Sequence, residues 1–367
     1  MLLSDICEII MGQSPSSDSY NVKGQGLPFF QGNADFGKLY PSVRLWCNCP
    51  IKKAEAGDLL VSVRAPIGAV NLANQKCCIG RGLAALRPYR DKCDAMYLYY
   101  LIKAGKNKLN WLGTGSTFKA ITRSSLLSFN VPDYCIAFQR KISGKLWSVD
   151  KLIHQRNEQL KLFDLLIQSR FIEMFGDSQS NPKGFPYKRI NEFAKCIAGA
   201  TPSTKRKEYW SNGIIPWMSS GEVNYKRIWE TEKRISQVGY DSCSTKMIPA
   251  HTVVIAMAGQ GRTRGTVAVA EIPLCTNQSL CSIITDGTVD TDYLFTYLQF
   301  QYNNLRNISN GSSGRGGLNI KLIGQFAVLV PPLAIQQKFS NFLKEIDKSK
   351  YRGRIFLRLL EDASHML

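Results

Sequence analysis

The sequence contains a long internal repeat. Residues near 2–175 return, with the same order of motifs, near 190–365. Gly12-Gln13-Ser14-Pro15-Ser16 corresponds to Gly199-Ala200-Thr201-Pro202-Ser203, and most later matches, such as Tyr97 with Tyr293 or Gln139 with Gln336, are 196 or 197 residues apart. A repeat of this length restricts the chain to an arrangement of two similar halves related by pseudo-two-fold symmetry.

Each half ends in a segment that is typical of a long helix. In the first, from about Ile136 to Phe175, apolar residues alternate at spacings of three and four, with Arg156 and Arg170 completing the series; the apolar members are Ile142, Leu146, Val149, Ile153, Leu160, Phe163, Ile167 and Met174. This spacing predicts a coiled-coil seam. The helix is expected to end at Gly176 and the turn residues that follow.

The second helix is predicted from about Ala334, with Phe339, Leu343, Ile346, Leu357 and Leu360 in the seam. Lys350 and Gly353 occupy the positions of Ile153 and Arg156. Glycine inside a helix costs about 1 kcal/mol relative to alanine, so we expect this helix to be weakened or bent near its middle. The pseudo-symmetry favours antiparallel packing of the two helices over two independent core helices.

The globular part of each half is predicted to be mostly β. Short β-branched or apolar runs are bounded by Gly, Pro or Asn, as at 59–63, 253–257, 266–270 and 326–330. One short helix is expected in each half, at Ala95–Asn107 and at Asp292–Asn304. The fold class is therefore α/β (α+β), with two small, curved, mostly-β domains and two long antiparallel helices.

The chain is strongly basic, with a formal net charge of +19. Residues 1–133 and residues 179–331 each carry an excess of seven positive charges, whereas 134–178 carry two and 332–367 carry three. An equal excess of positive charge on two similar domains favours binding of both to one long polyanion. The alternative is that the charge only keeps the protein soluble. We expect a cytoplasmic protein, because the N-terminus has no basic start followed by a long apolar region.

The sequence lacks the motifs of several common enzyme classes. It contains no phosphate-binding Gly-x-x-x-x-Gly-Lys-Ser/Thr loop and no Gly-x-Ser-x-Gly elbow. Val330-Pro331-Pro332-Leu333 lacks the polar and aromatic residues of an amino-methyltransferase motif, so we interpret it as a helix start. The 11 cysteines and 3 histidines show no zinc-binding spacing, which favours reduced thiols and no bound metal.

These motifs resemble the specificity subunit of type I restriction–modification enzymes. The resemblance covers essentially the whole chain and rests on the order of its motifs, repeated twice. They are the Gly-x-Ser/Thr-Pro-Ser loop of each half, Ile215-Pro216-Trp217 followed by Gly221-Glu222-Val223, the Pro and Gln that precede and open each long helix, and Phe171-Ile172-Glu173-Met174-Phe175-Gly176-Asp177. The first half departs from the pattern, with Phe29 in place of Trp217 and a different following loop.

The resemblance implies two target-recognition domains, at 1–133 and 179–331, and two conserved helical segments, at 134–178 and 332–367. Each domain would read one half of a split double-stranded DNA target, and the helix pair would set the gap. The chain itself would be non-catalytic and would bind no cofactor. Its partners would be two methyltransferase subunits, which use S-adenosylmethionine, and restriction subunits, which use ATP and Mg²⁺; no membrane is implied.

Amide and charged side chains in the loops are candidates for base reading, because they can form paired hydrogen bonds in the major groove. In the first domain these are Gln31, Asn33, Arg64 and Arg81, with Gln13, Lys38 and Lys119 expected on the DNA backbone. In the second they are Glu222, Gln260, Arg262, Arg264 and Gln278, with Lys205, Lys226, Ser312 and Arg315 expected on phosphates. Arg64, Arg262 and Arg264 are favoured, because they follow apolar strands in the equivalent loop of both halves.

Two other classes stay open at this point. The chain could be the DNA-recognition portion of a split or fused type II methyltransferase–endonuclease, which a neighbouring catalytic domain would reveal. A duplicated RNA-binding adaptor would instead prefer single strands and bind them by aromatic stacking.

Overall fold

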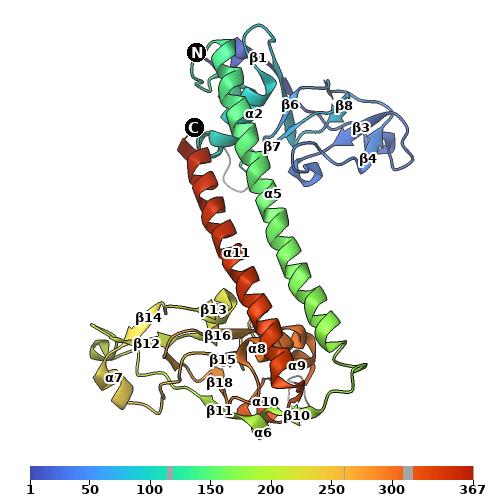
Figure 1. Ribbon diagram of the computed structural model, residues 1–367. Coiled ribbons are helices and arrows are strands. Elements are labelled where there is room, and N and C mark those ends of the chain that lie inside the picture. Colours follow the sequence, from blue (N-terminus) through green and yellow to red (C-terminus); the bar gives the residue numbers. More distant parts are fainter. Residues whose placement is uncertain (114–118, 260, 309–316, 367) are drawn as a thin grey trace. The chain divides into compact units, whose positions relative to one another are not determined.

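The computed structural model describes residues 1–113, 119–259, 261–308 and 317–366, without the side chains of 364–366. The chain forms two compact units, residues 1–157 with 356–367 and residues 158–355. Each unit contains one globular domain and parts of both long helices (Figure 1).

The first domain contains two sheets. A four-stranded antiparallel sheet has the order β1-β9-β6-β7, and a five-stranded mixed sheet has the order β2-β4-β3-β8-β5, with β3 and β8 parallel. The strands are β1 Cys7–Met11, β2 Tyr20–Asn21, β3 Leu27–Phe30, β4 Leu45–Cys47, β5 Lys53–Ala54, β6 Leu59–Ser62, β7 Val70–Leu72, β8 Cys77–Ile79 and β9 Leu83–Pro88. The helices and helical turns are α1 Leu3–Ile6, η1 Ser17–Ser19, η2 Asn33–Asp35, α2 Ala95–Ala104, α3 Lys106–Leu112 and α4 Arg123–Leu127.

The second domain repeats this plan. The sheet β11-β18-β15-β16-β13 corresponds to the antiparallel sheet of the first domain, and the parallel pair β12–β17 in the sheet β14-β12-β17 corresponds to β3–β8. The strands are β10 Tyr187–Arg189, β11 Ala194–Ala198, β12 Ile215–Met218, β13 Arg227–Ile228, β14 Lys233–Ile235, β15 Thr252–Ala256, β16 Val267–Ala270, β17 Cys275–Thr276, β18 Leu280–Thr285 and β19 Ala327–Leu329, which pairs with β10. The helices and turns are α6 Ile190–Phe193, η3 Lys207–Tyr209, η4 Ser220–Tyr225, α7 Gln237–Asp241, α8 Thr291–Phe300, α9 Tyr302–Ile308 and α10 Ile320–Gly324.

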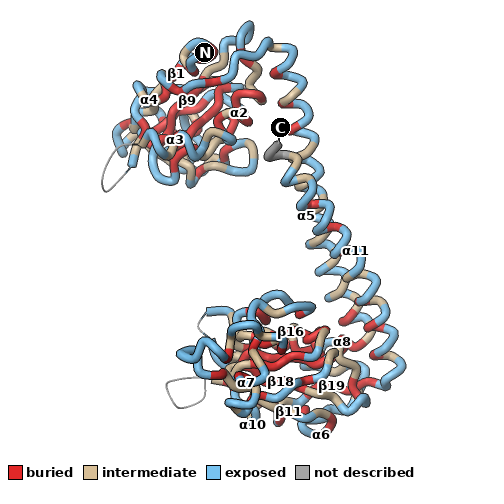
Figure 2. The backbone as a smooth tube through the Cα atoms, turned by 90° about the vertical axis from the view of Figure 1, so that its left-hand side faces the viewer, coloured by how far each residue is buried: buried red, intermediate tan, exposed pale blue. Residues whose placement is uncertain are grey.

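The two long helices have the predicted bounds. α5 spans Ile136–Phe175 and α11 spans Leu333–Met366, directly after Pro331-Pro332. Every predicted seam residue of α5 and α11 is buried or half-buried, whereas most of their other residues are exposed (Figure 2). α11 is continuous through Gly353, which is buried in the seam; the predicted weakening or bending at this glycine stays a prediction.

Within the second unit the helices pack antiparallel. The ring of Phe171 lies 5.3 Å from that of Phe339, and further along, Asp164 of α5 meets Lys350 of α11. In the first unit, the guanidinium of Arg156 lies 5.1 Å from the centre of the Phe356 ring. The antiparallel coiled coil predicted from the seam is therefore present in the part of the helices that belongs to the second unit.

The prediction of one short helix after the main sheet was incomplete. The segment expected as Ala95–Asn107 is two helices, α2 and α3, divided at Gly105, and its counterpart is divided at Gln301 into α8 and α9. The main core of each unit lies between the antiparallel sheet and these helices, and it includes residues from the first turns of the long helices.

None of the helices in the described part of the chain has the length and hydropathy needed to cross a bilayer.

Candidate nucleic-acid interface

Four loops of the first domain meet at one edge. They follow the carboxyl ends of β1, β3, β6 and β8. The Gln13 amide donates to Ile79 O at 3.1 Å, the Gly80 amide to Phe30 O at 2.8 Å and the Val63 amide to Gly82 O at 3.0 Å. β1 and β6 run in the same direction, with β9 between them, and β3 runs parallel to β8, so each pair ends on one side of its own sheet. The three hydrogen bonds bring these ends together. We call this the four-loop edge.

Two glycines allow these loops to approach so closely. A Cβ on Gly12 would lie 2.2 Å from Gly80 O, and a Cβ on Gly82 would lie 2.4 Å from Gln31 O. No side chain fits at such distances, so the glycine of the Gly-x-Ser/Thr-Pro-Ser motif is required by the packing of backbone on backbone. The glycine of the motif therefore allows these loops to join.

Five of the predicted residues of the first domain lie on this edge with exposed side chains: Gln13, Gln31, Arg64, Arg81 and Lys119. The Arg81 amide donates to Ser14 Oγ at 3.2 Å, and a β-bridge between Arg64 and Ala120 places Lys119 next to Arg64. Asn33 follows in η2 and is half-buried. The edge thus combines three cations with two exposed amides, the groups that contact phosphates and base edges.

The second domain has the same edge. The Asn277 amide donates to Met218 O at 3.1 Å and the Met257 amide to Ser279 O at 2.8 Å, so the loops after β12, β15 and β17 meet. A Cβ on Gly199 would lie 1.7 Å from Thr276 O, which brings the loop after β11 to the same place. The Thr201 hydroxyl donates to the exposed Gln278 side chain, in the position of the Ser14–Arg81 contact.

The loop that carries Arg262 and Arg264 is held by helix α9. The Tyr302 hydroxyl donates to Arg262 O at 3.0 Å, and Arg306 Nη1 donates to Gly261 O at 2.6 Å. The Arg262 side chain is exposed and that of Arg264 is half-buried. Arg262, Tyr302 and Arg306 line a hollow of about 620 Å³ together with Asn224, Gly261 and Thr266. The hydrogen bonds from α9 thus attach the residues at 261–262 to the wall of this hollow.

Three predicted lysines lie away from the four-loop edges or at their margin. Lys226 is the equivalent of Leu39, the residue after Lys38, because Lys226 O and Leu39 O accept amide hydrogen bonds from Val269 of β16 and Leu72 of β7. Lys205 is exposed in the loop after Pro202. Gln260, Ser312 and Arg315 lie outside the described residues.

The structure corrects the prediction for Glu222. Its side chain is buried, and its carboxylate accepts hydrogen bonds from the Ser219 amide at 2.6 Å and the Glu232 amide at 3.0 Å. Asp35 does the same in the first domain, where it accepts from the Gln31 amide at 2.8 Å. Glu222 therefore shapes its loop and does not present an acceptor to a base.

Sequence reasoning missed several residues near these edges. No sequence motif marks Tyr302 or Arg306 as part of a site. The only indication is that their helix, α9, is the counterpart of α3 in the repeat. Lys321 lines a second hollow, of about 550 Å³, beside Gln278. Trp111, at the end of α3, is 88% exposed, although a tryptophan would be assigned to a core on hydropathy alone.

Two neighbouring thiols of the first domain, Cys77 and Cys78, are inert in this setting. Burial raises the pKa of both Cys77 and Cys78 to about 12, so they are protonated at neutral pH and poor as nucleophiles or metal ligands. All 11 cysteines are free. Within the described ranges, no group of three or more His, Cys, Asp or Glu side chains could hold a metal ion.

Comparison with known proteins identifies the family. The model of the type I restriction modification DNA specificity domain matches residues 1–162 and again 182–352. Over 152 residues the chain is 44% identical to the putative type I restriction enzyme MjaX specificity subunit of Methanocaldococcus jannaschii, a match that covers 41% of this chain and 36% of that protein. The MjaIX specificity subunit of the same organism is 22% identical over 372 residues, which covers 94% of this chain and 85% of the relative.

The fold also matches a solved structure. The type I restriction-modification system S subunit from M. genitalium superposes with a TM-score of 0.67 at 14% identity, covering 100% of this chain and 93% of that one. At this identity the likeness shows the fold alone. The family model, by contrast, matches both halves of the sequence. The chain therefore belongs to the family of type I restriction–modification DNA specificity subunits, whose domain it contains twice.

Proposed function

We propose that this chain is the non-catalytic DNA-recognition subunit of a cytoplasmic type I restriction–modification complex. Each domain reads one half of a bipartite duplex target through its four-loop edge. The observation that carries the proposal is the duplication of this edge, with cations and amides exposed on both copies. The two edges differ in detail, with Arg81 where the second domain has Gln278, so the two half-sites differ in sequence.

Base reading is assigned to the exposed ends of the loops. Gln31, Arg64 and Arg81 read the first half-site, and Arg262, Arg264 and Gln278 read the second. Each well-placed paired contact contributes about 1–3 kcal/mol of discrimination. Gln13 and Lys119 in the first domain, and Lys205 in the second, contact the DNA backbone and set the register without reading sequence.

The long helices have two roles in this proposal. They set the number of unread base pairs between the half-sites, and they dock methyltransferase subunits that use S-adenosylmethionine. Apolar side chains outside the seam support docking: Leu162 is 62% exposed, Leu165 58% and Ile172 50%. Restriction subunits, which use ATP and Mg²⁺, complete the assembly.

The test is a domain exchange read out by methylation. The chain is produced with its methyltransferase subunit, and the methylated adenines of the host genome are mapped by single-molecule sequencing. We expect a motif of two specified halves around an unspecified gap. Replacing residues 184–330 with those of a relative changes one half and leaves the other half unchanged.

Two outcomes would contradict the proposal. A swap that alters both halves would mean that the domains do not read independently. Methyl transfer to duplex DNA by the chain alone, free of any partner and supplied with S-adenosylmethionine, would mean that it is catalytic.

A further inference from the structure

Each long helix has an aspartate at the same place in the repeat, bonded to its own recognition domain. In the first unit, Asp150 Oδ2 accepts from the Tyr100 hydroxyl at 3.0 Å and lies 3.2 Å from Lys103 Nζ. In the second unit, Asp347 Oδ2 accepts from Arg227 Nε at 2.9 Å. The helix residue is the same in both halves, whereas the partner comes from α2 in one and from β13 in the other.

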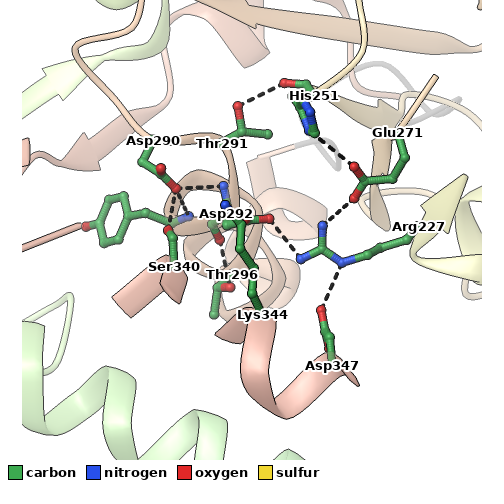
Figure 3. Close-up of polar contacts among 11 residues, drawn as sticks. Arg227, His251, Glu271, Asp290, Thr291, Asp292, Thr296, Ser340, Lys344 and Asp347 are labelled. Carbon is green, nitrogen blue, oxygen red and sulfur yellow. Dashed lines mark hydrogen bonds and ion pairs between the residues drawn. The ribbon is translucent and has the colours of Figure 1, made fainter. Parts of the chain in front are cut away.

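The Arg227 guanidinium is bound by residues of its own domain as well as by the helix (Figure 3). Its side chain is 19% exposed, Nη2 donates to Asp292 Oδ1 at 2.8 Å, and Nη1 donates to Glu271. Glu271 is also 3.2 Å from His251 Nδ1, and the Phe295 ring lies 5.7 Å from the guanidinium. Burial alone would lower the pKa of Arg227, but these carboxylates outweigh it and raise the pKa, so the guanidinium is always charged.

A second attachment lies nearer the start of each helix and is identical in the two units. Gln336 Oε1 accepts from the Asp290 amide at 2.9 Å, and the Ser340 hydroxyl donates to Asp290. Gln139 and Ser143 contact Asp94 in the same way, at 3.0 Å and 3.1 Å. From Gln336 to Asp347 is 11 residues, or about 16 Å along the helix at 1.5 Å per residue.

Two contacts at different points along a helix restrict the orientation of the attached domain more than one contact does. A domain held at a single point can rotate about that point, whereas a second contact farther along the helix axis fixes the angle between domain and helix. The core packing of Phe339 and Leu343 lies between the two points and prevents sliding. The aspartate contact therefore controls angle more than it controls folding.

We propose that Asp347 and Asp150 are positioning residues that fix the angle of each recognition domain on its helix. Through that angle they determine which gap lengths the complex accepts. This inference rests on the proposed function. Asp347 has the larger effect, because Arg227 is already fixed by Glu271 and Asp292, whereas the Lys103 side chain is 49% exposed.

The test uses the complete methyltransferase complex and plasmids in which the two half-sites of its own motif are separated by the natural gap, or by one base pair more or fewer. Asp347→Ala removes the contact of Arg227 with α11, while Arg227 keeps Glu271 and Asp292 and the pair between Lys344 Nζ and Asp292 Oδ2, at 3.9 Å, is retained; alanine also favours the helix. The matched control is Glu345→Ala on the same helix, where the exposed Glu345 side chain pairs with Lys348 at 2.7 Å. Assembly and melting temperature are measured for both variants.

We expect Asp347→Ala to reduce the preference for the natural gap on the order of tenfold, within the range measured for residues in positioning networks, while Glu345→Ala keeps the wild-type preference. Asp150→Ala should act in the same direction but less. If Asp347→Ala assembles and retains the wild-type preference, or loses activity equally at all gaps, the inference is wrong. A wild-type complex that needs no bipartite motif would instead overturn the proposed function. Should Asp347→Ala fail to assemble, Asp150→Ala, which removes the equivalent contact in the first unit, carries the test with the same two readings.

Discussion

Lys350 and Asp164 form an ion pair between the two long helices in the second unit, with 2.5 Å between Nζ and Oδ1. The Lys350 side chain is only 9% exposed, whereas that of Asp164 is 59% exposed. Lys350 therefore places a buried ammonium group in the seam, at the position where α5 has Ile153. The carboxylate that neutralises it belongs to the exposed Asp164.

Replacing this lysine with an apolar residue should stabilise the helix pair. In Lys350→Leu, the cost of burying an ammonium disappears, while Asp164 stays in water. We expect the free energy of unfolding to stay equal or rise by about 1 kcal/mol, measured as the melting temperature of the full chain. Lys348→Leu, at an exposed position of α11, is the control for leucine itself. A fall in stability would mean that the ion pair contributes more than its desolvation costs.

Phe339 should be the most sensitive position for the attachment of α11 to its domain. Its side chain is fully buried, with ring centres 5.3 Å from Phe171 and 5.5 Å from Phe175. Phe339→Ala leaves a cavity among these rings, at an expected cost of about 3–5 kcal/mol. Calorimetry of the full chain would measure it.

The control for Phe339→Ala is Ile355→Ala on the same helix, where Ile355 is 46% exposed and the change should stay within about 0.5 kcal/mol. Equal effects of the two substitutions would show that the ring cluster is not what fastens the helix.

The features that were predicted correctly depend on short-range patterns. The three–four spacing from Ile142 to Met174 determines a helix and its seam, whatever the rest of the chain does. The division of the Ala95–Asn107 segment was missed, because Gly105 lies among good helix formers and only the packing of Phe129 against it shows that the chain must turn there.

The site was harder to predict, because it is assembled from distant segments. Glu222 has the residue type and neighbours of a base-reading group, but its burial depends on Glu232, ten residues later. The partners of Arg227 are Glu271, Asp292 and Asp347, on three different elements. Arg64 was found only because the repeat aligns its loop with that of Arg262.

Arg64 and Arg262 should each specify one base position. Both lie in the loop that follows the equivalent strand of the main sheet, β6 or β15, and have exposed side chains. If each holds a guanine edge, Arg64→Ala or Arg262→Ala should cost about 1–3 kcal/mol in binding and relax one position of the methylated motif. Binding is measured as dissociation constants for duplexes that vary one base at a time, at several salt concentrations.

Lys119→Ala is the comparison, because a phosphate contact weakens binding equally on all sequences and makes the salt dependence shallower. If Arg64→Ala or Arg262→Ala shows that uniform pattern, the arginine in question contacts a phosphate and not a base.

The length of the helices should determine the gap between the half-sites. A seven-residue insertion into both helices at matching places, near Ile153 and Lys350, preserves the seam and adds about 10 Å by helix rise. That corresponds to roughly three base pairs at 3.4 Å per base pair. The methylated motif should keep both halves and gain about three unread positions, as read from the methylated adenines of a host that carries the variant.

An insertion in α11 alone controls for the added residues, because it leaves the two helices unequal and places their seams out of register. It should abolish methylation rather than lengthen the gap. The result that would refute this prediction is an active complex with both insertions and an unchanged gap. The seam would then serve only to dock the methyltransferase subunits, and the gap would be set within the recognition domains, where the angle fixed by Asp347 and Asp150 would be the first candidate.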